Sequence, residues 1–192
     1  MHDFLPPLTD SERLIEERHA ACELLPQKAI RWFTEQQVPA AVLANPDVLV
    51  HAKVKFAGTR FIFHDEAAHY DKFQDALIIM LRDGDGRPYD LAAWARRPSR
   101  LGTWCGRAAV LGDPVAPRLH KHGALLVHPD PLGWLRHSRA GVVIIHRRTA
   151  ARELMDLGPL AAMGGKAHVG ELFALFGAMV PPIVDGSLPE AG

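Results

Sequence analysis

The chain has 192 residues, 48% of them hydrophobic, and its formal net charge is zero. This length and apolar content predict one domain over residues 1–192, with sub-lobes at 1–112 and 113–192, and exclude a largely disordered chain. No apolar run approaches the ~18 residues that a membrane-spanning helix needs, and the N-terminus lacks a secretory signal. Cys22 and Cys105 form no C-x-x-C pair, so we expect two free thiols in the reducing cytoplasm.

Helices are expected at the N-terminus. Thr9 and Glu12 have the spacing of a capping box, which predicts a helix that ends near Pro26. A second helix is predicted over residues 27–37, and Pro39 ends or bends it. One further helical turn is expected at 40–44, so the chain begins with a helical pair.

A predominantly antiparallel sheet of about five strands is predicted to follow. Residues 48–56 alternate between apolar and polar side chains, as a half-buried strand does. The stretch 75–104 organises the rest, because an apolar run is followed by Asp-Gly pairs that favour a tight turn. The expected strands span 48–56, 60–64, 76–81 and 89–95, and the last begins at 101.

The sequence pattern of the C-terminal part predicts a βαβ unit. Residues 124–127 and 142–145 form short apolar runs that predict a parallel pair of strands. Between them, Asp130 as N-cap and Pro131 at the first helical position predict a helix to about residue 140. Thr149 is expected to cap another helix, which ends at 158, and a final helix is expected over 169–180. The predicted fold class is therefore α+β.

The zero net charge conceals a segregation of charge along the chain. Residues 1–85 carry a net charge of −5, residues 86–152 carry +9 and residues 153–192 carry −4. Such asymmetry marks either an anionic partner or two parts of one molecule that face each other.

The basic middle region is the most informative feature of the sequence. Arginine binds phosphate through two parallel hydrogen bonds, and exposed aromatic rings stack on bases, so arginines among tryptophans on one face would form a nucleic-acid interface. In the alternative interpretation, the arginines are spread over the surface or pair with the acidic N-terminal helix, and the tryptophans belong to the core. The candidate nucleic-acid-binding residues are Arg96, Arg97, Arg100, Trp104, Arg107, Arg118, Lys121, Arg136, Arg147 and Arg148.

Catalytic, metal and cofactor motifs give weaker signals. The histidines at 64 and 69 are five residues apart, so they do not share a helix face as zinc ligands would. Residues 83–86 begin like a calcium loop, but Arg87 and Pro88 break the pattern and favour a hairpin turn. Five histidines at 120, 122, 128, 137 and 146 have no fixed ligand spacing. We therefore assign no catalytic residue, metal site or cofactor, and a histidine-dependent enzyme stays an alternative.

From residue 29 onward, about two thirds of the chain resembles the primase-helicase-type proteins of phages and mobile elements that carry a Toprim domain. The matching features are ALI at 76–78, DGDG at 83–86 and the rhythm of GALLVHPDPLGWL at 123–135. His128 stands where that family has its catalytic Glu, and HRR at 146–148 replaces its acidic pair. The resemblance therefore implies a Toprim-like shell without the acidic ligands that magnesium-dependent chemistry needs. The chain also resembles phage-associated proteins of similar length.

The function expected from the sequence is that of a non-catalytic accessory protein of phage or mobile-element origin, which binds DNA or RNA through its basic middle region. The alternative from another class is a structural or assembly protein that contacts a second copy or a protein partner. Neither interpretation involves a membrane.

Overall fold

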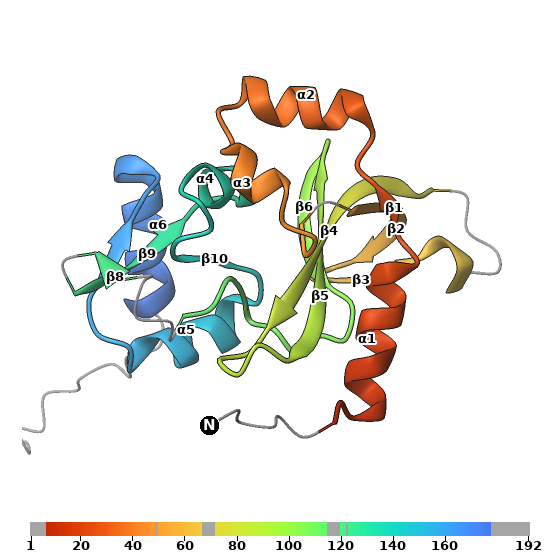
Figure 1. Ribbon diagram of the computed structural model, residues 1–192. Coiled ribbons are helices and arrows are strands. Elements are labelled where there is room, and N and C mark those ends of the chain that lie inside the picture. The colour runs from red at the N-terminus through yellow and green to blue at the C-terminus, as the bar shows by residue number, and fades with distance from the viewer. Residues whose placement is uncertain (1–6, 49, 67–71, 115–119, 122, 178–192) are drawn as a thin grey trace, which may run out of the picture.

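The computed structural model describes residues 7–48, 50–66, 72–114, 120–121 and 123–177 (Figure 1). The helices expected at the N-terminus are α1 (Asp10–Ala20), α2 (Gln27–Glu35) and the single turn α3 (Ala40–Leu43). The capping box is confirmed, because the Thr9 hydroxyl accepts a hydrogen bond from the backbone N–H of Glu12 and the Thr9 N–H donates to the Glu12 carboxylate.

The first sheet closes on itself. Its strand order is β1-β2-β3-β6-β5-β4, and β4 also pairs with β2, so the last five of these strands form a small barrel. The pairing of β3 with β6 is parallel, whereas all other strand pairings in this first sheet are antiparallel. The strands are β1 (Glu23–Leu24), β2 (Val50–Ala57), β3 (Arg60–Phe63), β4 (Gln74–Arg82), β5 (Pro88–Arg96) and β6 (Ser99–Thr103), with a 3-10 turn η1 (His64–Glu66) after β3.

The hairpin of β4 and β5 lies at the centre of the molecule, as the sequence predicted. Ile78 faces the barrel interior opposite Ala93, whereas Leu77 faces outward opposite Trp94, and all four side chains are buried. The turn between the strands is fixed by the carboxylate of Asp83, which accepts hydrogen bonds from two backbone N–H groups of the turn. Both faces of this hairpin are therefore covered, which explains its continuous apolar sequence.

The second sheet contains the predicted βαβ unit and extends it. Strands β9 and β10 are parallel and are joined by α4, and a further strand, β11, pairs parallel with the other edge of β9. The elements are β7 (Val110–Leu111), β8 (His120–Lys121), β9 (Ala124–His128), α4 (Pro131–Arg136), β10 (Val142–Ile144), α5 (Arg147–Met155), β11 (Leu160–Ala162) and α6 (Gly165–Gly177). The α+β class is confirmed, although β11 has no counterpart among the predicted strands.

Several helix boundaries differ from the sequence prediction. The first helix ends at Ala20 rather than near Pro26, because residues 23–24 form β1 and pair with β2. Helix α5 ends at Met155 rather than at 158. The helix that begins at Pro131 ends at Arg136 rather than near 140, because Ser138 and Arg139 have positive φ angles of 56° and 66° that no α-helix accommodates. The Thr149 cap is wrong, since α5 begins at Arg147. Helix α6 begins at residue 165 instead of 169, and the expected end at 180 lies outside the described residues.

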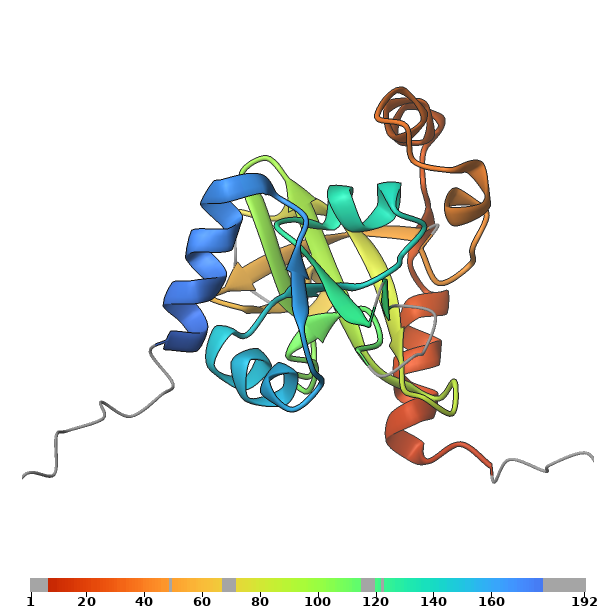
Figure 2. The same cartoon turned by 90° about the vertical axis from the view of Figure 1, so that its left-hand side faces the viewer.

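A common core joins the two sheets. We call this set of side chains the shared core, and it combines the outer face of β4 and β5 with α2, α3, α4 and β10. Leu77 and Trp94 of the hairpin belong to it together with Trp134 and Val143 of the C-terminal unit. Figures 1 and 2 show this unit on one side of the hairpin and α1 on the other. Within the described ranges, no helix has the length and apolar character to cross a membrane.

Candidate functional site

A groove runs between α2, the end of β5 and the start of α4. We call it the α2–β5 groove, and it consists of an outer pocket of about 550 Å³ and an inner pocket of about 290 Å³. The two pockets share Lys28, Asp75, Trp94 and Arg96, so they are continuous. The outer pocket is also lined by Trp32, Arg97, Ser99, Asp130 and Leu132.

Aromatic side chains form the wall and floor of this groove. Trp94 points outward from the barrel because it lies on the outer face of β5, and its ring centroid is 6.2 Å from that of Phe33 on α2. Trp32 precedes Phe33 on the helix and meets its ring edge-on at 5.0 Å. Phe33 and Trp94 are buried, whereas Trp32 is half-buried. The row of rings therefore continues from the shared core to the surface.

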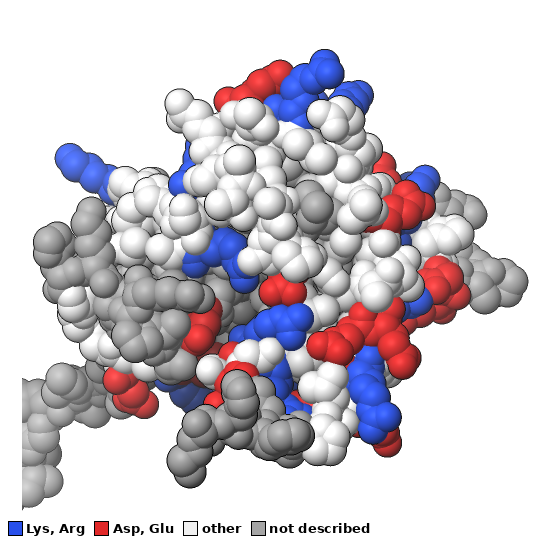
Figure 3. All heavy atoms as spheres, in the orientation of Figure 1, with Lys and Arg blue, Asp and Glu red and all other residues white. Residues whose placement is uncertain are grey.

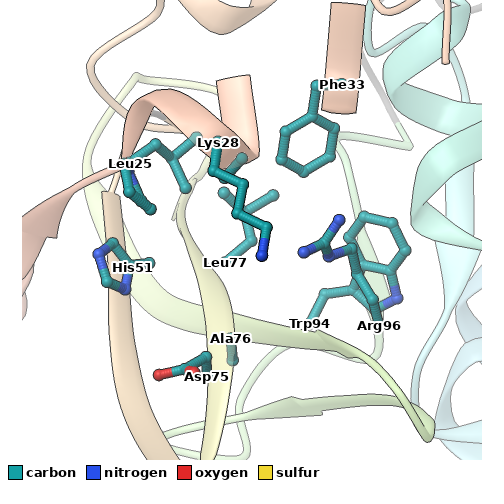
Figure 4. A pocket seen from close by; sticks show the side chains of 11 residues that line it. Leu25, Lys28, Phe33, His51, Asp75, Ala76, Leu77, Trp94 and Arg96 are labelled. Carbon is teal, nitrogen blue, oxygen red and sulfur yellow. The ribbon is translucent and has the colours of Figure 1, made fainter. Parts of the chain in front are cut away.

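Cations gather at the mouth of the inner pocket. The Arg96 guanidinium lies 4.2 Å from the Trp32 ring centroid, a cation–π contact. Figure 4 shows the ends of Lys28 and Arg96 pointing toward one another between Phe33 and Leu77. Burial, and then the charge of neighbouring Arg97, lower the pKa of Arg96. The mouth thus holds positive charges that repel one another.

Negative charge is present at the edges of the groove. Asp75 lies below the inner pocket in Figure 4, and Asp130 lines the outer pocket, where its carboxylate accepts a hydrogen bond from Gly133 as the N-cap of α4. Among the described residues, no carboxylate oxygen lies within 4.0 Å of a charged nitrogen of Lys28, Arg96 or Arg97. These three cations therefore have no ion pair within the part of the chain that the structure describes.

The structure brings together only some of the residues that the sequence singled out. Arg96 and Arg97 line the groove, and Arg100 is exposed nearby on β6, directly across from Ala95 of β5. Arg147 and Arg148 are exposed on α5, which lies at the opposite end of the molecule from α2 in both views (Figures 1 and 2). The face in Figure 3 likewise shows basic side chains dispersed among acidic ones.

Three of the other candidate residues bind neighbouring parts of the chain. Arg136 donates from Nε to the carbonyl oxygen of Gln36 at 2.6 Å, so it ties α4 to the end of α2. Arg107 donates to the Ser11 hydroxyl at 3.2 Å, and the Trp104 indole donates to the Glu66 carboxylate. Arg118 lies outside the described residues, and the side chain of Lys121 in β8 is likewise not described.

Several residues that line the groove were not among the candidates from the sequence, and two of them define its helical wall. Lys28 and Trp32 belong to α2, far from the basic middle region in the sequence. The spacing of Lys28 and Trp32 could have pointed to them, because residues four apart share one face of a helix. A lysine and a tryptophan on one face, next to the buried Phe33, indicate a helix whose edge borders a site.

Some of the charged side chains form ion pairs within the molecule. Arg87, at the start of the basic region, contacts Glu12 of the acidic half at 2.6 Å. Two further ion pairs lie within the acidic segment itself, Arg82 with Asp47 at 3.1 Å and Arg18 with Asp65 at 2.6 Å. The interpretation that acidic and basic parts of one molecule face each other therefore holds for α1 and the β4–β5 turn, whereas the groove cations are separate from it.

The histidines do not form a metal site within the described ranges, where no group of three or more His, Cys, Asp or Glu side chains is placed to hold an ion. The ring of His146 lies between the hydroxyls of Thr59 and Thr103, at 2.8 and 3.1 Å, and joins the two sheets. His128 and His137 approach with ring centroids 4.9 Å apart. The histidines at 69 and 122 lie outside the described residues, and the side chain of His120 is not described.

An exposed apolar face on α6 favours the alternative function, that of a structural or assembly protein. Phe173 is 76% exposed, and Val169, four residues earlier on the same helix face, is 38% exposed. Helix α6 lies on the other side of the molecule from α2, which forms one wall of the groove (Figures 1 and 2).

Comparison of the chain with protein-family models, with curated proteins and with solved structures gives no match. The fold and the groove thus define an α+β protein with a closed sheet, a parallel βαβ extension and a groove lined by cations and aromatic rings.

Proposed function

We propose that this protein is a non-catalytic nucleic-acid-binding protein that uses the α2–β5 groove. The observation that carries the proposal is the convergence of Lys28, Arg96 and Arg97 on one aromatic-lined groove, with no ion pair to a described carboxylate. Phosphate groups neutralise such cations, and aromatic rings contact bases, so the combination suits a nucleic acid. An accessory role for a phage or mobile element stays a prediction from the sequence.

The electrostatics of Arg96 support a bound anion. Its guanidinium is partly withdrawn from water and lies beside the charge of Arg97, and both effects lower its pKa. A phosphate in the groove would offset the repulsion and supply charge-assisted hydrogen bonds to the guanidinium groups. The stacking of Arg96 on Trp32 holds one of these donors in place before the ligand arrives.

Fluorescence anisotropy with labelled single- and double-stranded DNA, measured over a range of salt concentrations, tests the proposal. Each phosphate contact to a single strand contributes about −0.7 to the slope of log affinity against log salt, so the three groove cations predict a slope of about −2. Absence of binding at low salt would sink the proposal.

Paired variants locate the interface. The double substitution Arg96→Ala/Arg97→Ala should lower affinity at least about tenfold and reduce the slope to about −0.7, because one of the three cations remains. The matched control is Arg152→Ala/Lys166→Ala, which removes two exposed charges from α5 and α6. Equal losses in the two double variants would mean that net charge, rather than the groove, controls binding.

A further inference from the structure

The inner pocket lies at one end of the α2–β5 groove. Arg96 stands at its mouth, and Leu25 and His51 lie on the opposite side (Figure 4). Its volume of about 290 Å³ is at the lower limit of pockets that hold small molecules. The inner pocket therefore has room for a single small group of a chain molecule that lies along the cations.

The sign of the net charge changes beyond the inner pocket. Lys28 and Arg96 line the inner pocket together with Asp75, so its charged side chains sum to a positive charge. A neighbouring hollow shares His51 and Asp75 and is also lined by Glu23, by Lys53 and by the ion pair of Arg18 with Asp65, so its charged side chains sum to a negative charge. A polyanion is attracted as far as the two cations and repelled beyond them. The electrostatics thus favour a strand that stops in the inner pocket over one that passes through it.

The floor of the inner pocket suits a base rather than a phosphate. Phe33, Leu77 and Trp94 form an apolar surface there. A base offers an apolar face to such a surface, whereas a phosphate does not. A paired base would bring its partner with it, for which a pocket of this size has no room.

We infer that the groove takes the end of a single strand, with the terminal base in the inner pocket and the adjacent phosphates on Lys28, Arg96 and Arg97. This inference rests on the proposed function and adds to it the unpaired state of the ligand and the requirement for a free end.

Competition between linear and circular DNA tests the requirement for an end. A labelled linear oligonucleotide is displaced from the full-length protein by an unlabelled linear strand, by the same strand closed into a circle, or by a blunt duplex of the same sequence. We expect the circle and the duplex to compete at least about tenfold more weakly, since neither presents an unpaired terminal base to the inner pocket.

A substitution that fills the inner pocket tests the place of the base. Ala29 is half-buried on α2 and lines the inner pocket but not the outer one, so Ala29→Leu reduces the pocket without removing a cation. The control is Thr34→Leu, which adds bulk to an exposed position of α2 outside both pockets. Ala29→Leu should bind linear DNA as weakly as the original chain binds the circle, whereas Thr34→Leu should bind it normally.

The outcomes separate this inference from the proposed function. If the circle competes as well as the linear strand, the requirement for an end is overturned, and the groove proposal stands as long as Arg96→Ala/Arg97→Ala weakens binding. If no DNA binds at low salt, both are overturned. Because the comparison of linear with circular DNA uses the unaltered chain, it decides the matter even where Ala29→Leu fails to fold.

Discussion

Asp90 has a carboxylate that is completely buried, and it accepts four backbone hydrogen bonds. The donors are the N–H groups of Leu91, Cys105, Arg107 and Ala108, at distances of 2.7–3.1 Å. Charge-assisted bonds of this kind compensate for the loss of water around a buried charge. Asp90 therefore fixes the segment that leads from the barrel to the second sheet.

We expect Asp90→Ala to lower the free energy of unfolding by about 3 kcal/mol or more, because it leaves four buried or half-buried backbone N–H groups without an acceptor. Urea unfolding measures this loss. The matched control is Asp130→Ala, which removes a carboxylate that accepts one backbone hydrogen bond at an exposed helix N-cap and should cost about 1 kcal/mol. A loss at Asp90 no larger than at Asp130 would contradict the structural role.

The ion pair of Glu12 with Arg87 makes stability depend on pH. Hydrogen bonds from Arg87, and then from Thr9, lower the pKa of Glu12 from its ordinary 4.5 to about 2. A carboxylate whose pKa is depressed by folding stabilises the folded state above its unfolded pKa, and this contribution is lost as pH falls from about 4.5 toward 2. The original chain should therefore be more stable than Glu12→Gln at pH 7, and the difference should shrink below pH 4.5. Urea unfolding of both proteins at pH 7, 4 and 2.5 measures it, and a constant difference would contradict the assignment.

At the scale of elements, local signals predicted the elements better than their arrangement. The capping box at Thr9, the turn at Asp83 and the N-cap at Asp130 all use contacts between residues a few positions apart, and each is confirmed. The closure of the barrel depends on pairing β2 with β4 and β3 with β6, which no local pattern specifies. The early end of α4 results from two positive φ angles at residues that usually avoid them.

Because local patterns do not specify how elements pack, only part of the candidate site could be predicted from the sequence. Arg96 and Arg97 were found because they belong to a run of basic residues, but composition does not tell which face each arginine occupies. Arg147 and Arg148 belong to the same basic region and lie at the other end of the molecule. The helix wall of the groove comes from α2, and only tertiary packing brings it to the end of β5.

Arg136 distinguishes a positioning role from direct contact with phosphate. Its guanidinium donates to the carbonyl and side-chain oxygens of Gln36, at 2.6 and 2.9 Å, and so holds the end of α2 against α4. We expect Arg136→Ala to weaken nucleic-acid binding severalfold without changing the salt slope, because α2 shifts while the number of phosphate contacts stays the same. Anisotropy titrations over a range of salt concentrations measure both quantities.

A direct phosphate contact by Arg136 would instead reduce the slope by about 0.7. The control is Gln36→Ala, which removes one of the two hydrogen bonds and no charge. It should reproduce part of the loss of affinity if Arg136 acts by positioning α2. Normal binding by Gln36→Ala together with a smaller slope for Arg136→Ala would assign Arg136 to the interface itself.

At the scale of the whole molecule, the shared core joins the barrel to the βαβ unit. Val143 of β10 is 2% exposed and belongs to the same buried cluster as Leu77 and Ile79 of β4. A cluster that spans both sheets makes their folding interdependent, because neither sheet can bury its apolar face alone. The two sub-lobes expected from the sequence are thus held together through the outer face of the central hairpin.

Because the two sheets share a core, we expect a cavity in one sheet to lower the stability of the other. Val143→Ala should lower the free energy of unfolding by about 2 kcal/mol, from lost apolar burial and the residual cavity. If the molecule unfolds as one unit, the slowest-exchanging amides of β4 should lose the same free energy of protection, although β4 is in the barrel. Hydrogen exchange of the original chain and the variant measures this. If Val143→Ala leaves the protection of β4 unchanged, the barrel is stable without the second sheet. The walls of the α2–β5 groove come from both parts, so one of its walls would then open independently of the other.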